Sequence, residues 1–138
     1  MKVQEKIKKC VAFVALQMAD ETIRLVGTVF FIYRDKQKDN YSYAVTAKHV
    51  IEGIKSKGLD KVFLRMNLTD GQSGLFATRI SDWIYHNDEN IDIAIHPIVL
   101  KPNFDHLLYP ESSFVTSEFI NENEIDVGDE VIITSLFR

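Results

Sequence analysis

The sequence predicts an all-β fold, an antiparallel β-barrel of about six strands with one short helix. Three observations support this fold class. The 138 residues include nine Phe and five Tyr but only six Gly and three Pro, a composition that suits pleated, half-buried strands. Short runs rich in β-branched and aromatic residues recur between polar, turn-like clusters. One segment alone stands out for the apolar spacing of a helix.

Three strands are expected near the start of the chain, over residues 10–17, 22–33 and 41–46. The second run is long for a single strand and is interrupted by Gly27. A glycine inside a strand pattern is typical of a β-bulge or a bend. We therefore predict that the second strand is irregular at Gly27.

A short helix is expected over residues 47–54, directly after the third strand. Ile51 and Ile54 lie there at the spacing of one helix face. Gly53 and Gly58 mark the expected end of the helix, because glycine commonly follows the last helical turn. The helix is therefore expected to be about two turns long.

Three further strands are expected, over residues 62–67, 76–85 and 91–98. The run over 62–67 alternates between apolar and polar positions, as a strand with one buried face does. Together with the earlier elements, these strands predict a first β-barrel that comprises residues 1–98.

The rest of the chain is expected to be organised differently. Residues 99–126 are less regular and contain Pro102 and Pro110, which predicts a connecting strap. A strand pattern resumes at Val127. We interpret residues 127–138 as the first strand of a truncated second barrel.

The charge balance and the single cysteine exclude several classes of function. The net charge is −4 at pH 7, so nucleic acid is not an expected partner, because its binding depends on Lys and Arg. No apolar stretch has the length of a membrane-spanning helix, and no membrane partner is expected. Cys10 cannot form an intrachain disulfide and is expected to be a small buried apolar residue. The apolar run after Cys10 is too short for a signal peptide, so a cytoplasmic protein is expected.

His49 and Asp92 are the candidate functional residues. His49 lies where the third strand is expected to pass into the helix, a kind of junction that is often near a surface cleft. Asp92 lies in an apolar run, where burying its carboxylate would be costly without a hydrogen-bond partner. An imidazole N–H would keep the carboxylate ionised and fix the histidine tautomer. From the residues alone, a capped or solvent-facing aspartate on an edge strand fits Asp92 equally well.

Four motifs resemble those of trypsin-like serine peptidases of the chymotrypsin fold, and they occur in the order of that family. Residues 46–50, Thr-Ala-Lys-His-Val, resemble the Thr-Ala-x-His signature, and residues 92–95, Asp-Ile-Ala-Ile, resemble the Asp-Ile-Ala-Leu signature. Residues 27–32 resemble the Gly-Ser/Thr-Gly-Phe strand before the histidine, with Val29 in place of the second glycine. Residues 127–131, Val-Gly-Asp-Glu-Val, resemble the start of the second barrel in bacterial members.

The resemblance implies a serine endopeptidase with two β-barrels and an active site between them, of which this sequence matches the N-terminal part. In such an enzyme His49 would be the general base and then the general acid, and Asp92 would orient its imidazole. A serine from the second barrel would attack the scissile carbonyl, and backbone N–H groups would bind the oxyanion. The implied substrate is a peptide or protein, and the resemblance implies neither a cofactor nor a metal.

The glycine-flanked serine that the family places after Asp92 has no counterpart in this sequence. The serines after Asp92 lack flanking glycines; they are Ser112, Ser113, Ser117 and Ser135. Ser73 has a suitable neighbour in Gly74, but it precedes Asp92 and lies where a hairpin is expected. We therefore expect the chain to be inactive alone, because both the nucleophile and the oxyanion hole are missing.

The other three histidines, His86, His96 and His106, do not have the spacing of a metal-binding pattern. Each is about ten residues from the next, which matches no compact ligand set on a helix or a strand. We expect them on the surface or in loops and predict no metal site.

A non-catalytic binding or assembly module with the same half-fold is the alternative function. Such a module would need to cover the apolar barrel face that a second barrel covers in the peptidases. A homo-oligomer or a second chain could provide this cover.

Overall fold

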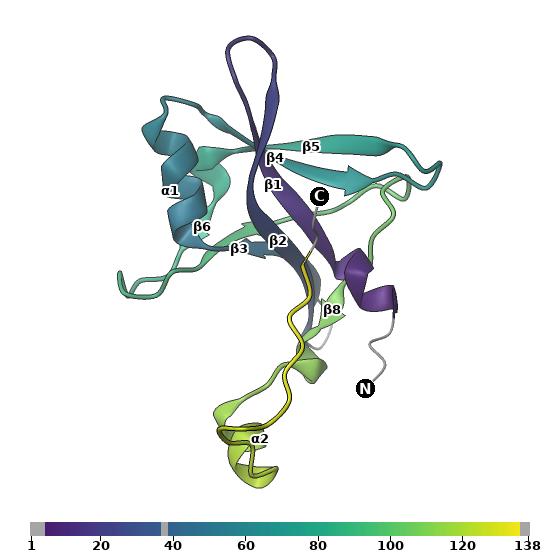
Figure 1. Cartoon of the computed structure of the whole chain (residues 1–138), viewed down its shortest axis with the longest axis vertical. Helices are drawn as coiled ribbons and strands as arrows, with labels where there is room; N and C mark the ends of the chain where they lie inside the picture. Colours follow the sequence, from purple (N-terminus) through teal and green to yellow (C-terminus); the bar gives the residue numbers. More distant parts are fainter. Residues whose placement is uncertain (1–4, 37–38, 136–138) are drawn as a thin grey trace.

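A computed structural model describes residues 5–36 and 39–135 (Figure 1). These residues form one mainly antiparallel β-sheet and a few short helices. The strands are β1 (Val11–Gln17), β2 (Ile23–Lys36), β3 (Asp39–Thr46), β4 (Lys61–Asn67), β5 (Ser73–Arg79), β6 (Ile84–Tyr85), β7 (Ala94–Pro97) and β8 (Tyr109–Pro110). The α-helices are α1 (Lys48–Ser56) and α2 (Ser117–Glu122), and the 3-10 helices are η1 (Glu5–Cys10), η2 (Ile80–Asp82) and η3 (Glu111–Ser113).

The predicted β class is confirmed, but the sheet is not closed into a barrel. Its strands pair in the order β5-β4-β1-β2-β3-β7-β6, and β8 adds a short parallel pairing to β2. The single strand expected over 76–85 is divided into β5 and β6 by η2. At this break the backbone N–H of Ile80 donates to the carbonyl of Asp60 and that of Trp83 donates to Ile80. As a result β5 pairs with β4, whereas β6 pairs with β7.

The predicted irregularity at Gly27 is confirmed as a register shift between β1 and β2. Val14 lies opposite Gly27, but Ala15 lies opposite Leu25, so Val26 is the extra residue of a β-bulge. A side chain at Gly27 would also meet a neighbouring element. A Cβ built there would lie 3.0 Å from Cγ1 of Val50 in α1, so the glycine permits a close approach of helix and strand.

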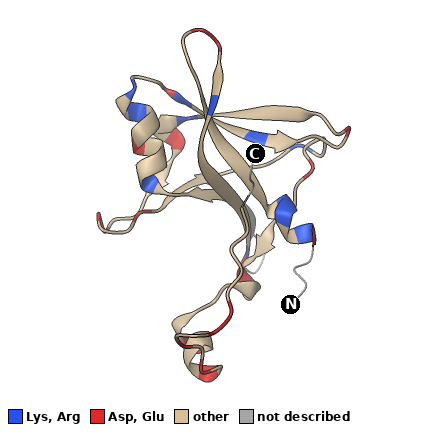
Figure 2. Ribbon diagram, in the orientation of Figure 1, with Lys and Arg blue, Asp and Glu red and all other residues tan. Residues whose placement is uncertain are grey.

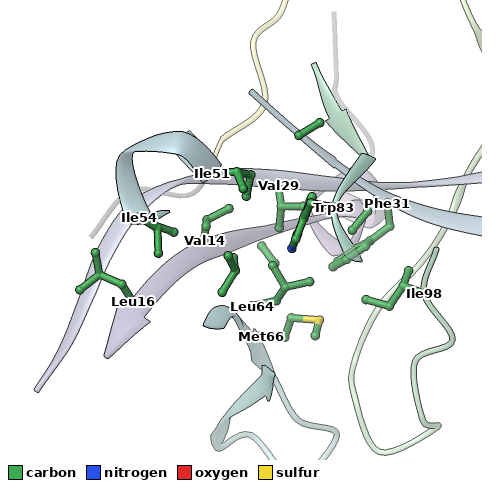
Figure 3. Packing of buried hydrophobic residues seen from close by; sticks show 14 residues of the cluster. Val14, Leu16, Val29, Phe31, Ile51, Ile54, Leu64, Met66, Trp83 and Ile98 are labelled. Carbon is green, nitrogen blue, oxygen red and sulfur yellow. The ribbon is translucent and has the colours of Figure 1, made fainter. Parts of the chain in front are cut away.

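The hydrophobic core lies between the inner faces of the strands and α1 (Figure 3). Ile51 and Ile54, predicted from their helical spacing, are buried there, each at 1% exposure or less. Each large apolar side chain buried in this way contributes about 1.5–3 kcal/mol. The other large residues with less than 2% exposure come from three strands: Val14, Leu16, Val29, Phe31, Val62 and Leu64.

Of the two glycines expected at the end of the helix, Gly58 lies just after α1, whereas Gly53 lies inside it. The helix continues through Gly53 to Ser56 and ends before Gly58, which has a φ of +75°.

Cys10 is buried, as expected, and burial raises the pKa of its thiol.

Alanine substitutions at Gly27 and Gly53 are expected to have opposite effects on stability. Gly27→Ala should lower the free energy of unfolding by about 1–3 kcal/mol, because the new methyl group overpacks against Val50. Gly53→Ala should raise it by about 0.5–1 kcal/mol, because Gly53 is an exposed position inside α1 with nothing within 4 Å of an added Cβ. Urea unfolding followed by the fluorescence of Trp83 measures both, and equal effects of the two variants would contradict the packing argument.

The C-terminal part departs from the sequence-based prediction. The strap expected over 99–126 contains β8, η3 and α2, and α2 lies away from the sheet (Figure 1). The strand expected over 127–138 is absent from the described residues 127–135, and 136–138 lie outside the description. Val127 and Ile133 are 101% and 87% exposed. The strand pattern is not realised because no neighbouring strand pairs with this segment, and a strand depends on such pairing.

The helices of the described residues are too short and too polar to cross a membrane.

Candidate functional site

The pairing of β3 with β7 brings His49 and Asp92 together although they are 43 residues apart in the chain. The two strands are antiparallel, and Thr46 at the end of β3 lies opposite Ala94 at the start of β7. The residues that follow Thr46 and those that precede Ala94 therefore meet at the same end of the sheet. The buried hydroxyl of Thr46 donates to the carbonyl of Thr28 at 2.8 Å, which holds the end of β3 against β2.

Asp92 caps the first turn of α1. The N-cap residue Ala47 has no side chain that could accept a hydrogen bond, and the first backbone N–H groups of a helix lack partners within it. The backbone N–H of His49 instead donates to Oδ1 of Asp92 at 2.8 Å. A carboxylate is favourable at this end of the helix because the helix dipole is positive there.

The second carboxylate oxygen of Asp92 binds the imidazole of His49. Nδ1 of His49 and Oδ2 of Asp92 are 2.5 Å apart. Because an ionised carboxylate only accepts hydrogen bonds, Nδ1 carries the proton. In the neutral imidazole Nε2 is then unprotonated and presents a lone pair. The His49 side chain is 73% exposed, so the ring is open to solvent and to an approaching group.

These two hydrogen bonds set the ionisation of the carboxyl group. The imidazole N–H and then the backbone N–H of His49 lower the pKa of Asp92 from its ordinary value. Asp92 therefore favours the folded state above its unfolded pKa of about 3.9, and this contribution is lost as the pH falls through the lower folded pKa. At neutral pH the carboxylate is ionised and ready to accept both hydrogen bonds.

Removing the imidazole should raise the pKa of Asp92. In His49→Ala the backbone hydrogen bond can remain, so the pKa should move toward about 3.9 and stop below it. A carbon-detected NMR titration of the side-chain carboxyl groups measures this change. Asp20 is an internal control, because its pKa is lowered by hydrogen bonds from Thr22 and should not change. An unchanged Asp92 midpoint would show that the imidazole does not stabilise the carboxylate.

The position of Asp92 corrects one expectation. β7 begins at Ala94, so Asp92 lies in the loop before the strand and not within it. Its side chain is 53% exposed, and the expected cost of burying the carboxylate does not arise. The solvent-facing alternative is therefore correct for its environment, although the carboxylate also has the imidazole partner.

Lys48, which precedes His49 in α1, lies over the ring of Tyr85, a β6 residue that pairs with Ala94 at the start of β7. Nζ of Lys48 lies 5.4 Å from the centre of the Tyr85 ring and 3.8 Å from a carboxylate oxygen of Glu52. Burial, with a smaller contribution from Glu52, raises the pKa of Tyr85, so its hydroxyl is a neutral phenol at neutral pH. Sequence reasoning assigned no role to Thr46, Lys48 or Tyr85. Thr46 and Lys48 belong to the motif over 46–50, and this motif was the signal in the sequence that could have indicated a role for them.

No serine of the described residues makes a hydrogen bond to His49. Ser73 begins β5, at the hairpin that lies on the opposite side of the molecule from α1 (Figure 1). The later serines lie in η3, at the start of α2 and in the C-terminal segment; they are Ser112, Ser113, Ser117 and Ser135. Within residues 5–36 and 39–135, the histidine and the aspartate are thus paired without a serine hydrogen-bonded to the imidazole.

The remaining histidines lie in three different environments. His86 is exposed and accepts a hydrogen bond from the backbone of Asp88. His106 is partly buried in the strap. His96 lies in β7 and not in a loop, with its ring 5.3 Å from that of Trp83. Within residues 5–36 and 39–135, no three His, Cys, Asp or Glu side chains are grouped as a metal site.

Comparisons of the chain with protein-family models, with curated proteins and with solved structures find no match. The case for a function therefore depends on the four sequence motifs and on the geometry of His49 and Asp92.

Proposed function

We propose that this chain is the histidine- and aspartate-bearing part of a trypsin-like serine endopeptidase that hydrolyses a peptide or protein substrate. One observation carries the proposal: Asp92 accepts hydrogen bonds from both Nδ1 and the backbone N–H of His49. A carboxylate held at two points fixes the orientation of the ring as well as its tautomer. Such an arrangement is what a general base needs, and the motifs that contain the two residues independently suggest the same role.

In the proposed mechanism, Nε2 of His49 removes the proton of an attacking serine hydroxyl. The serine oxygen then forms a bond to the scissile carbonyl carbon, and the imidazolium returns its proton to the leaving amine. Asp92 keeps Nδ1 protonated and stabilises the positive charge of the imidazolium between these steps. The described residues supply the base and its partner, whereas the serine and the oxyanion donors belong to another segment or another chain.

The sheet supports the finer proposal of a half-barrel. Its two end strands, β5 and β6, follow each other in the chain and are separated only by η2 and Trp83. Trp83 is buried, and its indole N–H donates to the hydroxyl of Thr78 at 2.9 Å. This buried hydrogen bond holds the break between β5 and β6 close to the core, as expected for a sheet that curls toward closure.

Labelling with a fluorophosphonate tests the proposed activity. The reagent is applied to the natural polypeptide or complex that contains this sequence; the serine oxygen bonds to phosphorus and fluoride leaves. Mass mapping should locate the label on a glycine-flanked serine outside the serines of this sequence. His49→Ala should abolish labelling, and His86→Gln, which changes another exposed histidine, should not. Labelling that persists in His49→Ala would overturn the assignment of the base.

A non-catalytic assembly module is the second candidate, and the exposed apolar residues of the C-terminal part favour it. Large apolar side chains between residues 99 and 133 are unusually exposed, including Val99, Val127, Val131 and Ile133 at 79–101%. Light scattering of the purified chain and fluorophosphonate labelling together separate the two candidates. The assembly module is supported if the chain forms a defined oligomer and no natural complex that contains it takes the label. The peptidase is supported if a serine that completes the site is labelled.

A further inference from the structure

A groove of about 480 Å³ lies on the molecule outside the site of His49 and Asp92. It forms where β1 and β4 diverge. The two strands pair only between Phe13–Ala15 and Phe63–Arg65, so Val11 has no partner in β4. The 3-10 helix η1 borders the opening and contributes Lys6, among other residues. The volume lies within the range of sites that bind small molecules.

Part of the lining of this groove is apolar. The half-buried side chains of Val11 and Phe13 line it, and it extends to the core residues Phe31 and Met66. Water in contact with such a surface is released when an apolar ligand covers it, which favours binding. A ligand with a hydrocarbon portion therefore fits the inner surface better than a small inorganic ion does.

The rim of the groove carries an excess of positive charge. Four cations line it, against the two carboxylates of Glu5 and Asp105. Lys8 pairs with Glu5 and Lys9 pairs with Asp105, each at 3.0 Å. The other two cations, Lys6 and Arg65, make no ion pair or side-chain hydrogen bond within residues 5–36 and 39–135. Figure 2 shows these basic positions at η1 and on β4 in a chain whose net charge is −4.

We propose that this groove binds an amphipathic anion, a medium-chain aliphatic carboxylate, with its headgroup at Arg65 and Lys6. The carboxylate would accept charge-assisted hydrogen bonds from the guanidinium of Arg65 and the ammonium of Lys6. The hydrocarbon chain would lie over Val11 and Phe13. Nucleic acid does not fit, because two unpaired cations over an apolar surface cannot follow a phosphate backbone. The proposal does not depend on the peptidase function, since neither His49 nor Asp92 lines the groove.

Titration calorimetry of the full chain with decanoate, decanol and inorganic phosphate tests the proposal. Decanoate should bind, whereas decanol and phosphate, which each lack one of the two features, should bind at least about tenfold more weakly. Arg65→Gln should weaken decanoate binding by about tenfold, because it removes the charge-assisted contact. Arg79→Gln, on the same hairpin but paired with Asp82, should leave the affinity unchanged.

Equal binding of decanoate and decanol would overturn the proposed role of the cations. If Arg65→Gln bound decanoate as tightly as the unsubstituted chain, the proposed role of Arg65 would also be overturned. If the chain did not bind decanoate, the whole proposal would be overturned. Arg65→Lys keeps the charge and controls for effects on folding. It should recover most of the affinity that Arg65→Gln loses, and a loss as large as that of Arg65→Gln would count against an electrostatic contact.

Discussion

In the proposed peptidase, replacing His49 with alanine is expected to lower kcat by about a millionfold, the magnitude that loss of the histidine has in serine peptidases. The physical reason is that no other base can remove the proton from the attacking serine, and that the imidazolium cannot then protonate the leaving amine. Oδ2 of Asp92 would also lose the imidazole N–H from which it accepts a hydrogen bond. Steady-state hydrolysis of a peptide substrate by the completed enzyme measures the effect, with His86→Gln as the matched histidine control.

Asp92→Asn should separate the chemical role of the carboxylate from its structural role. An asparagine oxygen can still accept the backbone N–H of His49 and cap α1. Its amide group, however, would donate toward Nδ1 and favour the tautomer with the proton on Nε2. The expected fall in kcat is about 10⁴-fold, the magnitude that the corresponding substitution has in a trypsin-like enzyme. Activity within about tenfold of the unsubstituted enzyme would mean that Asp92 is only a helix cap.

Ile51→Ala is expected to have the largest effect on stability, a loss of about 2–5 kcal/mol of unfolding free energy. Ile51 has 0% exposure and lies on the face of α1 that enters the core (Figure 3). Removing most of its side chain leaves a cavity where the helix carrying His49 packs against the sheet. Because a domain of ordinary stability has only about 5–15 kcal/mol in total, a large part of the folded population at elevated temperature should be lost.

Urea unfolding followed by Trp83 fluorescence measures the effect of Ile51→Ala. Ile51→Val is the graded control and should cost about 0.5–1.5 kcal/mol. The pairing of His49 with Asp92 should weaken in Ile51→Ala as α1 loosens, which the Asp92 carboxyl titration would detect as a higher pKa. A loss below about 1 kcal/mol would mean that neighbouring side chains collapse into the cavity and that α1 is held mainly by other contacts.

Much of the local structure could be predicted because the information lies within a few neighbouring residues. The spacing of Ile51 and Ile54 predicts the buried face of α1, and Gly27 predicts the bulge in β2. The break between β5 and β6 was not predicted, since it depends on a hydrogen bond from Ile80 to Asp60, twenty residues earlier. The strand pattern after Val127 was predicted but has no partner in the described residues, and pattern alone does not form a sheet.

The candidate site, like the fold, could be predicted from the sequence only in part. The motifs around His49 and Asp92 were enough to select these two residues, and residues 93–138 contain no glycine-flanked serine. The contact between the two residues follows from the fold, because it depends on the register that places Thr46 opposite Ala94. The exposure of Asp92 and its capping of α1 also follow from the fold, since they depend on where β7 begins and on what packs around the side chain. Residue types specify the chemistry available, whereas distances between residues far apart in the chain arise from strand pairing and packing.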